Sequence, residues 1–254
     1  MLAVQGFGVR GPRGWAFREV EFTAEPGTLV AVEGPSGAGR TSLLLALTGR
    51  MRATEGSAEV GSLRLPRQAA AVRRISALAH VPGVTDLDPA LTVAEHLRER
   101  ALLQRRFGTS LRSLLSPRAE RAAASALLRE SALTAAGLAP ETLVKGSRTA
   151  VRDLERIEAL RLSVALALIG RPRLLAVDDL DLKLSDAELA AAWRMLTAIT
   201  EAGTTVVAVG QGAPDAAQKV RLGTTDEMSG TTDEKSGTTD EKGAADALAE
   251  TGRS

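Results

Sequence analysis

The residues best suited to chemistry lie in a glycine-rich stretch near the N-terminus. Gly34 to Ser42 read GPSGAGRTS, which matches the phosphate-binding pattern G-x-x-x-x-G-K-[ST] except at Arg40. In that pattern the glycines let backbone N–H groups surround phosphate oxygens, the lysine reaches the β- and γ-phosphates, and the hydroxyl holds Mg²⁺. Arginine keeps the positive charge but presents a planar fork instead of a compact ammonium. The sequence therefore predicts a nucleotide-binding loop with an altered central cation.

The segments around this loop are expected to position it. Leu29 to Glu33 is a short apolar run typical of a buried strand, and Thr41 to Leu47 is expected to be a helix. A strand, a glycine loop and a helix in this order place phosphates at a helix N-terminus. Taken alone, the loop could equally be a glycine-rich turn at the end of a strand. The residues assigned to nucleotide binding are Gly34, Pro35, Ser36, Gly37, Ala38, Gly39, Arg40, Thr41 and Ser42.

Two further apolar runs predict strands of the same sheet. Leu174 to Val177 reads LLAV and ends in the carboxylates Asp178 and Asp179, and Thr204 to Val209 reads TTVVAV. Continuous apolar strands that alternate with helices are typical of a parallel sheet covered on both faces. The sequence thus predicts an α/β fold.

Three further helices are predicted between the strands Leu29–Glu33 and Leu174–Val177. Thr92 and Glu95 have the spacing of a capping box, and Ser116 with Pro117 is suited to an N-cap and first turn. Gly170 and Pro172 are expected to end the third helix. The three helices are expected to run through Arg106, from Ser116 to about Ala136, and from Leu154 to Gly170.

The composition excludes several functional classes. The 254 residues are 44% hydrophobic and carry 32 Lys and Arg against 31 Asp and Glu, which describes a soluble globular protein without the basic excess that nucleic-acid binding needs. There is no cysteine, so disulfides and cysteine-bound metals are excluded, as is usual in the cytosol. We expect no signal peptide and no membrane-spanning segment.

The C-terminal segment differs in kind from the rest. Residues 223–243 contain three copies of a seven-residue unit, GTTDEMS, GTTDEKS and GTTDEKG. No position repeats an apolar side chain, so the period of seven cannot form a coiled-coil seam. An acidic segment rich in threonine and glycine buries too little apolar surface to offset its ordering entropy. We expect residues 223–254 to be a disordered tail.

The order of the motifs resembles that of a known family. After the glycine loop come Leu91 to Leu97 (LTVAEHL), Arg171 to Asp179 (RPRLLAVDD) and Thr204 to Gln211 (TTVVAVGQ). Together they resemble the ATPase domain of ATP-binding cassette (ABC) proteins over Met1 to about Leu222. The resemblance implies a P-loop NTPase fold of ABC type, with a mainly parallel sheet flanked by helices, an antiparallel N-terminal β part and a helical subdomain at about residues 84–170.

The resemblance also implies roles for individual residues. Asp178 falls where the family places the aspartate that holds Mg²⁺ through water, together with the hydroxyl of Thr41; its alternative role is to cap a helix. Asp179 falls where the family has a glutamate that polarises the attacking water, and it is one methylene shorter. Trp15 is the candidate for the aromatic platform under adenine, with packing as an alternative role. Gln211 falls at the family's switch histidine, and can bond a phosphate but carries no charge at neutral pH.

The chain departs from the family pattern at five places: Arg40, Gly83, Leu154–Glu158, Asp179 and Gln211. Gly83 falls at the lid glutamine and has no side chain to reach Mg²⁺. The segment LERIE stands at the signature motif, and we interpret it as a solvated helical turn. Removing one transition-state contact typically lowers a rate by about 10² to 10³. The departures therefore predict weak or lost ATP hydrolysis.

The interpretation favoured by the sequence is an ABC-type ATP-binding subunit that binds Mg-ATP and hydrolyses it poorly. Its implied partners are a multi-span membrane permease, which would dock near Gly83 to Leu97, and a second ATP-binding subunit in a homo- or heterodimer. Its implied place is cytoplasmic, at the inner face of the cell membrane through that permease. The alternative is a non-catalytic adaptor that keeps the fold for docking. A soluble P-loop regulator is disfavoured by the order of the motifs.

Overall fold

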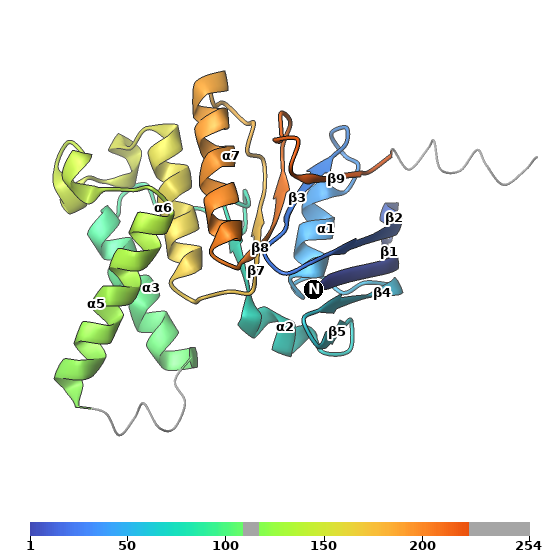
Figure 1. Ribbon diagram of the computed structural model, residues 1–254, viewed down its shortest axis with the longest axis horizontal. Coiled ribbons are helices and arrows are strands. Elements are labelled where there is room, and N and C mark those ends of the chain that lie inside the picture. Colours follow the sequence, from blue (N-terminus) through green and yellow to red (C-terminus); the bar gives the residue numbers. More distant parts are fainter. Residues whose placement is uncertain (109–116, 224–254) are drawn as a thin grey trace, which may run out of the picture.

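The computed structural model describes residues 1–108 and 117–223 (Figure 1). The strands are β1 (Leu2–Gly11), β2 (Gly14–Ala24), β3 (Leu29–Glu33), β4 (Glu55–Val60), β5 (Leu63–Leu65), β6 (Ser76–Ala79), β7 (Leu174–Val177), β8 (Thr205–Val209) and β9 (Gln218–Arg221). The helices are α1 (Arg40–Leu47), α2 (Ala69–Ile75), α3 (Val93–Gly108), α5 (Arg118–Ala135), α6 (Arg156–Leu168) and α7 (Asp186–Glu201). Three short 3₁₀ turns lie between α5 and α6, at Pro140–Thr142, Gly146–Arg148 and Val151–Asp153.

The strands form two sheets of different kinds. A five-stranded sheet has the order β6-β7-β8-β3-β9, and all of its neighbouring strands are parallel. A four-stranded sheet has the order β2-β1-β4-β5, and its neighbours are antiparallel. The predicted α/β fold with a mainly parallel sheet and an antiparallel N-terminal part is confirmed.

Helices cover both faces of the parallel sheet, as its uninterrupted apolar strands require. Along β3, Val30 and Val32 face α1 and the antiparallel sheet, whereas Leu29 and Ala31 face α6 and α7. Figure 1 shows α1 between the two sheets and α6 and α7 on the other side of the parallel sheet. The short α1 is therefore fixed from both sides, and so is the loop that leads into it.

A separate helical region carries its own small core. Leucine, valine, isoleucine and alanine side chains of α3, α5, α6 and the connecting turns pack together, among them Val93, Leu162 and Ile169. Helix α3 begins at the predicted capping box, because the Thr92 N–H donates to Glu95 Oε2 (2.8 Å) and the Glu95 N–H donates to Thr92 Oγ1 (3.3 Å). The helix continues two residues beyond the predicted end, to Gly108.

The predicted elements match the structure closely, with small shifts at the ends. The strands Leu29–Glu33 and Leu174–Val177 have the predicted bounds, and the third begins one residue late. The helix predicted over Leu154–Gly170 is shorter at both ends, because Glu155 is extended at its N-cap and Ile169 is its C-cap. Ser116 and the predicted tail, apart from Gly223, lie outside the described residues. In the part of the chain that the structure describes, no helix is long and apolar enough to cross a membrane.

Candidate functional site

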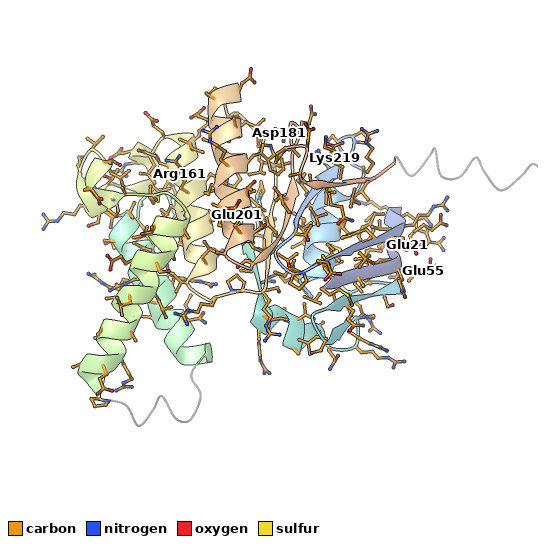
Figure 2. The ribbon with its side chains drawn as sticks, in the orientation of Figure 1. Glu21, Glu55, Arg161, Asp181, Glu201 and Lys219 are labelled. Carbon is orange, nitrogen blue, oxygen red and sulfur yellow. The ribbon has the colours of Figure 1, made fainter. Side chains whose placement is uncertain are left out.

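The candidate site lies where three neighbouring parallel strands end. Strand β8 lies between β7 and β3, so the carboxyl ends of all three meet at one edge of the sheet. Ligands of open α/β sheets bind outside this edge. Gly34 follows β3 directly, Asp178 follows β7 directly, and Gln211 lies two residues beyond β8. Figure 2 shows Asp181, in the loop after the carboxylates, at this end of the sheet.

The glycine loop needs its glycines for two separate reasons. Gly37 and Gly39 have φ angles of 84° and 81°, which other residues rarely adopt. In addition, a Cβ on Gly39 would overlap the carbonyl oxygen of Ala16 in β2, and a Cβ on Gly34 would lie 2.6 Å from the carbonyl oxygen of Leu222. The loop is therefore clamped between the antiparallel sheet and the C-terminal end of the described chain.

The loop leads into α1, whose first turn holds the predicted phosphate and cation contacts. Gly39 is the N-cap residue, and Arg40, Thr41 and Ser42 form the start of the helix. No acidic side chain lies in this first turn, and no side chain caps it. The N–H groups at a helix N-terminus carry a partial positive charge and favour an anion. Thr41 is exposed, and Arg40 and Ser42 are half-buried.

Asp178 is a buried carboxylate that is only partly satisfied. The residue is 1% exposed, its Oδ1 accepts the Asp179 N–H (3.0 Å), and its Oδ2 has no hydrogen-bond partner among the described residues. Burial raises the pKa of Asp178 above its ordinary value, and the charge of Asp179 adds to this rise, whereas the Thr41 hydroxyl and the Arg40 charge oppose it. Native proteins rarely bury an unpaired acceptor without a functional reason.

These oxygens fit a hard divalent cation. Mg²⁺ prefers oxygen ligands, keeps several waters and is usually held by one or two carboxylates with substrate phosphates. The unpartnered Asp178 Oδ2 beside the Thr41 hydroxyl provides such a donor pair at the start of α1. Within residues 1–108 and 117–223, no group of three or more histidine, cysteine, aspartate or glutamate side chains could hold a metal ion by itself. The donor set therefore suits a cation that arrives with its phosphates and water.

Asp179 has a strained backbone. Its φ of 44° lies in the left-handed region, which costs a residue other than glycine about 1–3 kcal/mol. The next residue anchors the turn, because the Leu180 N–H donates to the Val209 carbonyl at the end of β8 (3.0 Å). Such strain persists only where the surrounding structure enforces it, and it gathers at functional sites.

Two predicted site residues have other contacts in the structure. Trp15 is half-buried, and the Arg10 guanidinium lies over its ring, 5.6 Å from the ring centre. The next residue of β2, Ala16, abuts Gly39, so the strand itself borders the glycine loop, whereas the Trp15 ring lies against Gly8 of β1. Gln211 is exposed, and its carbonyl oxygen accepts a hydrogen bond from Trp193 Nε1 (3.0 Å).

The structure shows the surroundings of two positions at which the sequence departs from the family pattern, Gly83 and the segment Leu154–Glu158. Gly83 is exposed in a turn in which its N–H donates to Asp86 Oδ2 (2.9 Å). Glu155 occupies the N-cap of α6, and its N–H donates to Glu158 Oε2 (2.9 Å). Glu155 and Arg156 are exposed, so the interpretation of LERIE as a solvated helical turn is confirmed for these side chains, whereas Ile157 is buried.

One residue at this edge was missed by the sequence reasoning. His80 follows β6 as Asp178 follows β7, and these strands are paired neighbours. Burial lowers the pKa of the His80 imidazole, and the nearby carboxylates of Asp179, Asp178 and Asp86 oppose this effect. The sequence offered one signal, a histidine directly after the apolar run ISALA. This signal points to a site only once β6 is known to pair with β7, and these two strands are far apart in the sequence.

Comparison with known proteins identifies the family of this fold. The family model for the ABC transporter matches residues 17–180, which include the glycine loop, Asp178 and Asp179. The chain belongs to the ABC transporter family. The match covers more than half of the chain and confirms the resemblance inferred from the order of the motifs.

Individual relatives agree with this assignment. The chain is 39% identical over 79 residues to the hemin import ATP-binding protein HmuV of Gloeobacter violaceus, over 30% of this chain and 29% of that protein. It is 27% identical over 211 residues to the ribose import ATP-binding protein RbsA 1 of Burkholderia cenocepacia, over 82% of this chain and 38% of that protein. The chain thus spans less than half the length of these relatives.

A solved structure shows the same fold. The ATP-binding cassette MJ0796, in a dimeric post-hydrolysis state bound to ADP and Pi, superposes with a TM-score of 0.65 at 20% identity. The match covers 87% of this chain and 94% of that one. The described domain therefore has the architecture of an ABC cassette.

The two central glycines of the loop should differ in their tolerance of alanine. Gly39→Ala adds an overlap with the Ala16 carbonyl to the strain of a positive φ, whereas Gly37→Ala has strain alone, because nothing lies within 4 Å of its Cβ position. We expect Gly37→Ala to cost about 1 kcal/mol of unfolding free energy and Gly39→Ala about 3 kcal/mol or more. Urea unfolding measures both. Equal losses would show that the loop is not clamped against β2.

Asp178→Asn should stabilise the nucleotide-free protein. A carboxyl with a raised pKa makes the folded state bind its proton more tightly, so stability falls as the pH rises from the ordinary value through the raised one. The amide removes this loss, and we expect a gain of about 1–2 kcal/mol at pH 7 that shrinks as the pH is lowered. Thermal unfolding between pH 5 and 8 tests this, with the exposed Asp215→Asn as control. A destabilised Asp178→Asn variant would contradict it.

Proposed function

We propose that this chain is the ATP-binding subunit of an ABC-type membrane transporter, that it binds Mg-ATP at the loop Gly34–Ser42, and that it hydrolyses ATP weakly. The observation that carries the proposal is the unpartnered, buried Oδ2 of Asp178 beside Thr41 and Arg40. A purely structural turn would not require a buried carboxylate at a glycine loop, and membership of the ABC transporter family supplies the ligand class.

The phosphates would be held by the glycine loop and the start of α1. Glycines 34, 37 and 39 let the backbone approach an anion closely, and the first turn of α1 contains no acidic side chain to repel one. Arg40 adds a positive charge, which is close enough to Asp178 to lower the pKa of its carboxyl. Trp15, on the strand next to the loop, is the proposed platform for the base, with Arg10 already over its ring.

The cation would be held by oxygen donors from two elements. The Thr41 hydroxyl comes from α1 and the Asp178 carboxylate from the end of β7, which suits direct and water-mediated contacts respectively. When bound, Mg²⁺ would neutralise charge on the phosphates. The chain's own contribution is to hold these two groups in place, and the sheet register does so.

Weak hydrolysis follows from the side chains around this core. Asp179 is short and lies on a strained backbone, and positioning of an attacking water is sensitive to about 1 Å. Gly83 contributes no side chain. At the start of α6, the Glu155 N–H already donates to Glu158, so this helix end offers a carboxylate pair where the family offers donors. Losses within one catalytic unit are not additive, yet together they remove most of the support for turnover.

The proposed partners are a multi-span permease and a second ATP-binding subunit. The relatives named above are ATP-binding proteins of hemin and ribose import, and the cassette MJ0796 is dimeric. We propose that the chain works at the inner face of the cell membrane through that permease. The domain limits follow the same reasoning, with a cassette at residues 1–222, its helical subdomain at about 84–170, and a separate tail at 223–254.

Binding of Mg-ATP is the direct test. Calorimetry should show binding, and ATP at 100 times its Kd should raise the unfolding free energy by about 2.7 kcal/mol. Thr41→Ala should reduce this stabilisation in the presence of Mg²⁺, and Ser62→Ala, which removes an exposed hydroxyl from the β4–β5 turn, should not. No heat and no thermal shift at millimolar ATP would refute the proposal and favour the non-catalytic adaptor.

Restoring the two altered side chains should raise turnover. Arg40→Lys with Asp179→Glu returns the compact cation and the longer carboxylate of the family pattern. Because each such group is typically worth about 10² to 10³ in rate, we expect phosphate release to rise at least about tenfold. Adding Asp178→Asn should abolish the gain. An unchanged rate would place the limiting defect at the start of α6.

A further inference from the structure

His80 and Asp178 occupy equivalent places on neighbouring strands. Strands β6 and β7 are parallel, and their last paired residues are Ala79 and Val177. The next residue on each chain is therefore His80 on one and Asp178 on the other. The register of the sheet, and not local sequence, brings an imidazole to the edge where the buried carboxylate lies.

The backbone of His80 is held in an uncommon conformation. Its φ is 51°, and that of Asp179 on the neighbouring strand end is 44°. The His80 N–H donates to the Oγ of Ser163, a buried residue of α6, over 2.8 Å. A backbone that a neighbouring element holds in a strained conformation is a candidate for a functional position.

The turn that follows His80 directs its own hydrogen-bonding groups inward and offers no side chain to the strand edge at Gly83. The Thr85 N–H donates to the Val81 carbonyl (2.9 Å), the Val81 N–H donates to Thr85 Oγ1 (2.8 Å), and the Gly83 N–H donates to Asp86 Oδ2 (2.9 Å). The turn is thus closed on itself, and Gly83 has no side chain. No other imidazole lies on this stretch, because the chain has two histidines and the second, His96, belongs to α3.

The surroundings of His80 combine partial burial with three nearby carboxylates. Burial lowers the pKa of His80, and Asp179, Asp178 and Asp86 act in the opposite direction. A neutral imidazole has one nitrogen that donates and one that accepts a hydrogen bond. It can therefore accept a hydrogen bond from a metal-bound water, as an amide oxygen of glutamine could.

We propose that His80 is a positioning residue of the nucleotide site, and that its imidazole accepts a hydrogen bond from a water bound to the Mg²⁺ at Asp178. The inference rests on the proposed Mg-ATP site. His80 would thus place a polar group near the cation although Gly83 has no side chain. This group comes from the end of β6 and not from the turn that follows.

Histidine side-chain NMR gives a direct readout, because the chain has only two histidines. His96 is the internal reference: it is buried in α3, with its Nε2 3.2 Å from the Asp88 carbonyl oxygen. On addition of Mg-ATP at constant pH, the His80 ring signals should shift and those of His96 should stay. A His80→Gln variant assigns the signals. Unmoved His80 signals in protein saturated with Mg-ATP would overturn the proposal.

Calorimetry of variants separates this role from a structural one. His80→Ala should weaken Mg-ATP binding about tenfold, as expected for one hydrogen bond to a charged group, and should leave ATP binding in EDTA unchanged. His80→Gln should recover most of the affinity. An equal loss with and without Mg²⁺, or no loss, would refute the role of His80 while the ATP site stands. If the unmodified chain binds no ATP under either condition, the site and the inference fail together.

Discussion

The parallel register of β3, β8 and β7 is the constraint on which the rest of the site depends. Because these strands end at the same edge, a glycine loop and a buried carboxylate that are far apart in the sequence meet at the start of one short helix. Helix α1 is held between two sheets, and Gly39 abuts the Ala16 carbonyl, so the loop cannot move without the antiparallel sheet. A pre-formed cradle of this kind reduces the ordering that binding an anion would require.

The same edge also holds features that oppose stability. Asp178 keeps one buried oxygen without a partner, and both His80 and Asp179 have positive φ angles. Strands β7 and β8 are buried along their whole length, and helices α3 and α7 begin at capping boxes, at Thr92 and Ser185. An unpartnered buried carboxylate oxygen beside two strained backbones is what a functional site is expected to show.

The sequence predicts most of the scaffold but not every residue that the fold brings to the candidate site, for a physical reason. Strands β3 and β7 are apolar runs whose burial is the same on both faces, so composition alone sets their bounds. The Thr92–Glu95 box is local and was found, whereas the equivalent box of Ser185 and Glu188 at the start of α7 was not used, although its signal is equally local. His80 could not be placed from sequence because its importance depends on strand pairing. The contact of Arg10 with Trp15 likewise depends on the β1–β2 register.

The support of Gly34 by Leu222 has a consequence for how the chain is made. The Leu222 N–H donates to the Glu33 carbonyl (2.8 Å), and β9 pairs with β3 along its length. The outer wall of the glycine loop therefore comes from residues synthesised last in the described domain. On the ribosome, the N-terminal hairpin and α1 emerge early but lack this wall until β9 has left the exit tunnel. A nascent chain would thus complete the walls of this loop only after β9 has been synthesised, when the described domain can fold as a unit.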